Sequence, residues 1–156
     1  MATQHADIAA STWSCSVART LEVIGEKWTV LILRDAFLGV RRFDRFQADL
    51  GVARNILSDR LGKLVEHGIL ERRQYQDRPA RFEYRLTERG IDLYPVVLSL
   101  MAWGDKHAAP TGAPVTLVHE CGAEMVPELR CPSCGGEVHA RNVRPQAGPG
   151  LAPAAA

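Results

Sequence analysis

The chain has 156 residues, with 19 Lys and Arg against 18 Asp and Glu and a formal net charge of +1. Apolar residues make up 46% of it, which is enough for a buried core and excludes a wholly disordered chain. No apolar run approaches the roughly 18 residues that a transmembrane helix needs, and residues 1–14 lack the basic start of a secretory signal. We therefore expect a cytoplasmic protein with no membrane partner.

Composition divides the chain into unequal parts. Residues 15–107 alternate apolar and charged side chains with few prolines, as a packed domain does, whereas 108–114 are rich in Ala, Pro and Gly, as a linker is. We expect a flexible N-terminus over 1–14, a short appendage with three of the four cysteines over 115–144, and a disordered tail over 145–156. The domain itself is predicted to be mainly α-helical with a small β-hairpin, an α+β fold.

Apolar residues at helical spacing predict the helices of the first half. Val17, Leu21 and Ile24 follow an i, i+4, i+7 pattern that ends at Gly25. The next helix, over 27–38, is apolar around most of its circumference, so we expect it at the centre of the core. A short helix over 43–50 ends at Gly51, and a longer one over 53–67 turns four apolar residues inward: Leu57, Leu61, Leu64 and Val65.

The periodicity then changes from helical to alternating. Residues 69–75 and 81–86 read as two strands, joined by a loop over 76–80 with a basic tip. Thr87 is a suitable N-cap for a last helix over 88–107, about 30 Å long at 1.5 Å per residue. Pro95 either bends this helix or lies in its first turns, where proline is tolerated.

This order of elements, a short helix, a tight turn, a longer helix and a hairpin, is that of a winged helix-turn-helix. In such a fold the longer helix enters the major groove of double-stranded DNA, and the hairpin contacts the backbone or the minor groove. With its leucines inward, that helix displays Arg54, Asn55 and Ser58 as base readers. Further positive charges are expected mainly at phosphates, and the predicted DNA contacts also include Arg42, Arg60, Lys63, Arg73, Arg78 and Arg81.

The charge of this region agrees with a DNA partner. Residues 41–90 hold twelve Lys and Arg against eight Asp and Glu, a net charge of +4, and eleven of the twelve are arginine. A mixed-charge surface that only keeps a small domain soluble would give a similar count. The order of the elements favours DNA.

The sequence also resembles the HxlR-type transcriptional regulators, a winged-helix family related to the MarR-like proteins. The resemblance covers residues 15–107 and departs at Ala53, where the family usually has a small polar residue that caps the recognition helix. It implies a homodimer on a pseudo-palindromic operator, without catalysis. The matching segments are CSVAR (15–19), LEVIGEKW (21–28), LILR (31–34), RF (42–43), LS (57–58), GIL (68–70), EYRLT (83–87) and WG (103–104).

Apolar stripes on the last predicted helix support a dimer independently. One stripe is enough to dock that helix on its own domain, and a second needs a partner. The first predicted helix is its natural complement across a two-fold axis, unless both stripes are buried within one chain. The two stripes consist of Ile91, Tyr94, Leu98 and Met101, and of Leu93, Val96, Val97, Leu100 and Trp103.

The cysteines suggest two further roles. Cys15 precedes the first helix, one turn from Arg19, and some members of the family use a cysteine there to sense oxidants; the alternative is a small buried residue at the dimer contact.

The appendage contains Cys131-Pro-Ser-Cys134-Gly-Gly, a turn typical of zinc ribbons. His119 and Cys121 are the candidate partner ligands for a structural zinc, with His139 as another possible fourth ligand. A metal-free tail is equally compatible with the sequence, and no cofactor is required for the DNA-binding role. A disulfide or a thioredoxin-like redox role has less support.

Other function classes are less well supported. No nucleophile stands next to a base, and the chain has no glycine-rich phosphate loop or carboxylate pair of the kind that enzymes use. The main alternative to a transcriptional regulator is a metal- or redox-sensing interaction module in which the C-terminal cysteines are the working part.

Overall fold

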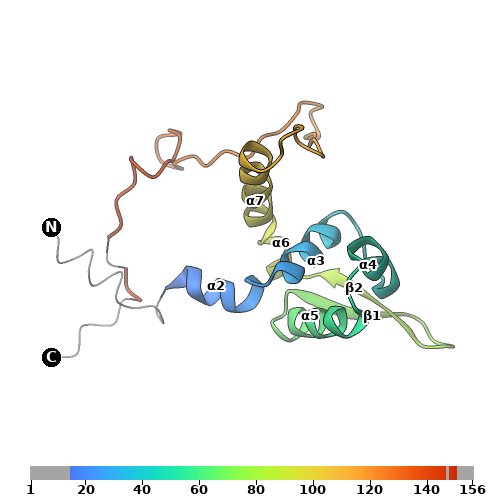
Figure 1. Cartoon of the computed structure of the whole chain (residues 1–156). Coiled ribbons are helices and arrows are strands. Elements are labelled where there is room, and N and C mark those ends of the chain that lie inside the picture. The colour runs from blue at the N-terminus through green and yellow to red at the C-terminus, as the bar shows by residue number, and fades with distance from the viewer. Residues whose placement is uncertain (1–14, 147, 151–156) are drawn as a thin grey trace.

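The structure is a computed structural model, and it describes residues 15–146 and 148–150. Figure 1 shows helices α3, α4 and α5 gathered around a two-stranded hairpin, with α2 extending to the left and α7 rising above α6. The predicted flexible N-terminus lies outside the described residues, as do positions 147 and 151–156 of the predicted disordered tail. The elements are α2 (Ser16–Ile24), α3 (Lys27–Phe37), α4 (Phe43–Leu50), α5 (Arg54–Glu66), β1 (Leu70–Gln76), β2 (Arg81–Leu86), α6 (Glu88–Ile91) and α7 (Tyr94–His107).

The core lies between α3, α5 and the hairpin. Ile32 and Leu33 of α3 are fully buried, so the predicted central position of this helix is confirmed. The predicted inward leucines of α5 are also buried, whereas Val65 is only half-buried. Each such side chain contributes about 1.5–3 kcal/mol by leaving water, and the rest of the core consists of Ile24, Phe46, Val52, Ile69 and Leu70.

The turn between α4 and α5 depends on a glycine. Gly51 ends α4 with φ of 61°, in the left-handed region that other residues rarely adopt. The chain then reverses, and α5 begins after Ala53, whose side chain makes no capping hydrogen bond. The departure of Ala53 from the family pattern thus leaves the N-terminus of α5 without a side-chain cap.

The hairpin is antiparallel and pairs Leu70 with Leu86 at its base, with an irregularity between Gln74 and Gln76. The segment before α4 extends it, because the backbone N–H of Tyr84 donates to the carbonyl of Arg41 over 2.7 Å. The start of α4 is thereby tied to the hairpin.

The last helix differs from the single helix that the sequence predicts. It is divided into α6 and α7, and Pro95 lies in the first turn of α7, the second of the two positions expected for it. Proline has no N–H to donate, so a helix start suits it better than a helix interior. Thr87 caps α6 as predicted, accepting from the N–H of Gly90 over 3.1 Å.

A close approach explains the glycine at position 90. A Cβ atom on Gly90 would lie 2.2 Å from the carbonyl oxygen of Ile69. Any larger residue would therefore separate α6 from the start of the hairpin.

Beyond α7 the described chain contains no helix, and two of its short turns are each closed by one isolated bridge. Val118 pairs with Glu124 in the first turn, and Arg130 pairs with Glu137 in the second. Figure 1 shows these turns at separate places along the C-terminal segment. None of the described helices is long and apolar enough to cross a membrane.

Candidate nucleic-acid interface

A solvent-open groove of about 710 Å³ lies between the N-terminal end of α5 and the hairpin. Arg54, Asn55 and Ser58 of α5 line one wall, and all three are exposed. The structure therefore brings the three predicted base readers together. The remaining lining residues are Phe43, Arg72, Phe82 and Tyr84.

The position of these three side chains follows from the core. Leu57, Leu61 and Leu64 are each 1% exposed or less, and they fix the rotation of α5 about its axis. At about 100° per residue, Asn55 and Ser58 lie about 150° and about 100° from the centre of that stripe and face solvent. Arg54 lies only about 50° from it, and its side chain is exposed at the first position of the helix. The same leucines that stabilise the fold thus aim the N-terminal end of α5 outward.

Arg54 is oriented by an aromatic ring. Its guanidinium carbon lies 4.7 Å from the centre of the Phe43 ring, and its Nη1 lies 3.8 Å from Oδ1 of Asp44. The Arg54 side chain is 72% exposed, so this long ion pair is worth about 0–1 kcal/mol at most. Arg54 is held in place while its charge stays accessible to DNA.

A second hollow of about 610 Å³ adjoins the first and shares Arg54, Phe43 and Phe82 with it. Arg42 and Arg81 line this hollow, and the Arg42 guanidinium carbon lies 4.8 Å from the Tyr75 ring centre. Two further predicted contact residues therefore lie beside the recognition helix. Arg78 is exposed in the loop at the hairpin tip, next to a cis Arg78–Pro79 bond.

Arg72 is a candidate contact that the sequence analysis missed. Its guanidinium carbon lies 3.7 Å from the Phe82 ring centre, and it lines the first groove. In the hairpin register Arg72 stands opposite Tyr84, whereas Arg73 stands opposite Glu83 on the other face. Pairing the two predicted strands in this register would have placed Arg72 on the same face of the hairpin as Phe82 and Tyr84, and Arg73 on the other face.

Several other cations are paired with carboxylates inside the chain. The Arg60 side chain is only 14% exposed and forms ion pairs with Glu26 and with Asp59, the latter over 3.1 Å. Lys63 also lies 3.4 Å from Asp59. A phosphate contact by Arg60 would require these pairs to open, so its position does not favour the predicted role.

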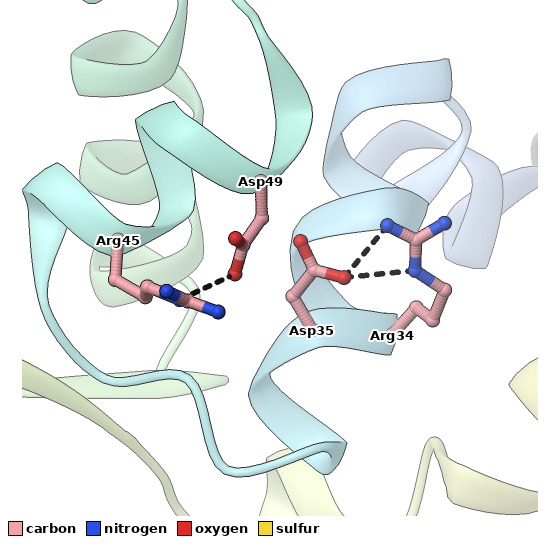
Figure 2. Close-up of polar contacts among 4 residues, drawn as sticks. All are labelled: Arg34, Asp35, Arg45 and Asp49. Carbon is pink, nitrogen blue, oxygen red and sulfur yellow. Dashed lines mark hydrogen bonds and ion pairs between the residues drawn. The ribbon is translucent and has the colours of Figure 1, made fainter.

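Figure 2 shows two more such pairs. Nε of Arg45 lies 3.0 Å from Asp49 along one face of α4, and Nη2 of Arg34 lies 2.7 Å from the buried Asp35. These arginines are oriented by neighbouring carboxylates, in contrast to Arg72, which is oriented by a ring.

All four cysteines are free thiols. Cys15 is exposed directly before α2, and its carbonyl accepts from the N–H of Arg19 over 3.0 Å. The backbone N–H groups of Cys134 and Ser133 lower the pKa of the Cys131 thiol by hydrogen bonding to its sulfur.

The predicted zinc ligands are not gathered at one point. His119 and Cys121 belong to the first turn of the appendage, and Cys131 and Cys134 belong to the second. Among residues 15–146 and 148–150, no three or more His, Cys, Asp or Glu side chains are grouped so that they could hold a metal ion.

Comparison with known families finds a match over residues 23–111 to a family described as HxlR-like helix-turn-helix. An HTH-type transcriptional regulator of Mycobacterium tuberculosis is 51% identical over 138 residues, which is 87% of each chain. An alignment of that length extends past residue 107, so the similarity includes part of the C-terminal segment.

Solved structures give the same result. PA1607, a candidate transcription factor, matches with a TM-score of 0.77 at 39% identity, over 88% of this chain and 98% of that one. The oxidized form of the redox regulator HypR matches with a TM-score of 0.55 at 35% identity, over 59% of this chain and 96% of that one. The match to HypR has about the length of the winged-helix domain alone.

Proposed function

The chain belongs to the HxlR-like helix-turn-helix family and is a DNA-binding transcriptional regulator rather than an enzyme, and we propose that it acts as a homodimer on a pseudo-palindromic operator. In this proposal α5 lies in the major groove, and the hairpin lies against the DNA backbone. A cytoplasmic location is part of this proposal, because it is consistent with a transcription-factor family.

The proposal that α5 reads the base sequence rests on one observation. Arg54, Asn55 and Ser58 lie together on the exposed N-terminal end of α5. Arginine pairs bidentately with guanine and asparagine with adenine, while serine can bond to either. Arg42 and Arg81 line the hollow beside this end, and Arg78 is exposed at the hairpin tip. All three would meet phosphates, which position the protein without reading sequence.

Exposed apolar side chains support the homodimer. Val17 and Leu21 of α2 are more than half exposed, and so are Leu100 and Trp103 of α7. Within the described chain no residue of α7 is buried. Covering these side chains with the same surfaces of a second copy would remove them from water at about 25 cal/mol per Å².

Base substitutions in the operator test the proposed reading mode. Arg54→Ala and Asn55→Ala should each lose about 1–3 kcal/mol of discrimination at one base pair per half-site, as measured by fluorescence anisotropy on single-base variants of the bound sequence. Arg45→Ala is the matched control, because Arg45 is already paired with Asp49. If both test variants rank all DNA sequences as the wild type does, α5 is not the reading helix.

Oxidant control through Cys15 is a second candidate role. Its exposure at the start of α2 favours it, as does the similarity to HypR, which is a redox regulator. Peroxide should then weaken DNA binding of the wild type and leave Cys15→Ser unaffected. An equal response of both proteins would leave Cys15 with its alternative role as a dimer-contact residue.

Structural zinc in the appendage is a third candidate role. Cys131 and Cys134 lie in one closed turn, and the N–H of Gly135 donates to the Cys131 carbonyl over 2.8 Å, as in a two-thiolate knuckle. His119 and Cys121 would complete the site only if the two turns came together. Elemental analysis of the wild type against Cys131→Ser and Cys134→Ser would decide between zinc and a metal-free tail.

A further inference from the structure

We propose that Arg72 of β1 clamps one strand of the DNA backbone in the groove between α5 and the hairpin. The inference rests on the proposed function, and it assigns to Arg72 a phosphate contact that does not depend on base sequence.

Geometry places a DNA strand in this groove. If α5 occupies the major groove and the hairpin reaches the neighbouring backbone or minor groove, the sugar-phosphate strand that separates the two grooves must pass between them. The groove of about 710 Å³ lies at this position, with α5 residues on one wall and hairpin residues on the other.

The chemistry of the lining matches a phosphate. The polar side chains in the groove are two guanidinium groups, an amide and two hydroxyls, and no carboxylate is among the lining residues. The adjoining hollow, by contrast, includes Asp44. Arg72, Ser58 and Tyr84 can all donate hydrogen bonds to phosphate oxygens.

Arg72 is oriented without being neutralised. Its guanidinium stacks on Phe82, a half-buried residue of β2, at 3.7 Å. No carboxylate among the described residues lies within ion-pairing distance of Arg72, whereas Arg60 has two such partners and Arg85 has one. A stacked guanidinium keeps its N–H edges free, in the planar fork that matches two phosphate oxygens.

The sequence predicts Arg73 as a DNA contact, but in the hairpin register it lies on the opposite face of β1 and is not among the residues that line the groove. Arg73 therefore provides a matched control with the same charge on the same strand. The experiment uses the full-length chain with its bound sequence and single-base variants of that sequence, titrated at several salt concentrations. Circular dichroism and thermal melting verify that Arg72→Ala and Arg73→Ala remain folded. Phe82→Leu removes the ring beneath the guanidinium.

Arg72→Ala should weaken binding about tenfold, equally for the operator and its variants. It should reduce the slope of log K against log salt by about two, which is about one for each protomer of the dimer. Arg72→Lys should retain the slope because it retains the charge. Phe82→Leu should weaken binding less than Arg72→Ala does. Arg73→Ala should leave the slope unchanged.

Three results would overturn the inference. Arg72→Ala could bind with wild-type affinity and slope, or it could change the preference at one base pair, which would make Arg72 a base reader. Arg73→Ala could weaken binding and lower the salt slope as much as Arg72→Ala does, and the effect would then come from net charge alone. In each of these cases specific binding by the wild type would leave the proposed function standing, whereas a wild type without any DNA preference would overturn both.

Discussion

The segment from α3 to β2 and the flanking helices α2 and α7 bury their apolar residues in different ways. The first segment encloses Phe46, Leu57 and Leu61 at 1% exposure or less within a single chain. The flanking helices leave residues such as Leu21 and Trp103 more than half exposed. A single chain therefore buries the core of the segment from α3 to β2, whereas the exposed side chains of the flanking helices would be covered only in the proposed homodimer.

The largest effect is expected in the DNA-reading half. Leu61→Ala should lower the free energy of unfolding by about 2–5 kcal/mol, because it removes buried surface and leaves a cavity beneath α5. Leu38→Ala is the matched control at a leucine that is 67% exposed, and it should change stability by no more than about 0.5 kcal/mol. Urea denaturation measures both, and equal losses would contradict the assigned core.

The next effect belongs to the flanking helices. Leu100→Asp should raise the dimer dissociation constant about a hundredfold or more, because it would bury an unpaired charge in the proposed interface. Sedimentation velocity over a range of protein concentrations measures this. Leu38→Asp places the same charge outside the proposed interface and should remain dimeric. A wild type that is monomeric at all concentrations would contradict the proposed homodimer.

A smaller effect on DNA binding is expected in the second hollow, where Arg81 and the paired Arg45 should differ. Arg81→Ala should weaken DNA binding severalfold through the loss of a phosphate contact. Arg45→Ala should change it less than about twofold, because a phosphate contact by Arg45 would have to compete with its 3.0 Å pair to Asp49. Anisotropy titrations at one fixed salt concentration measure both affinities. A larger loss of affinity for Arg45→Ala than for Arg81→Ala would show that Arg45 is the residue that contacts a phosphate.

The smallest effect is expected from the appendage. A chain that ends at residue 114 should keep the base preference of the wild type, because none of the lining residues of either hollow comes from beyond that position. Selection of bound DNA by both proteins tests this expectation. A different preferred sequence for the truncated chain would show that the appendage contributes to recognition.

The sequence predicted those features that depend on local spacing. The i, i+4, i+7 pattern of α5 defined its inward face and therefore its exposed readers, and Thr87 was correctly identified as a cap. The division of the last helix was not resolved, because Pro95 is compatible with either a bend or a helix start.

Features that depend on long-range contacts were not predictable from spacing. Arg60 was expected at a phosphate, but its partner Glu26 is 34 positions away in the sequence and meets it only in the folded domain. Arg72 was missed because its role depends on the register that brings it to the side of Phe82 and Tyr84. The four predicted metal ligands were likewise grouped because of their spacing in the sequence, whereas the structure places them in two separate turns.

Selection of binding sites from a random duplex pool by the full-length protein tests the central claim most directly. A dimer that reads DNA through α5 should enrich an inverted repeat whose half-site centres lie about 10 base pairs apart, or a multiple of that spacing. Enrichment of no sequence, or of a single site without two-fold symmetry, would contradict it.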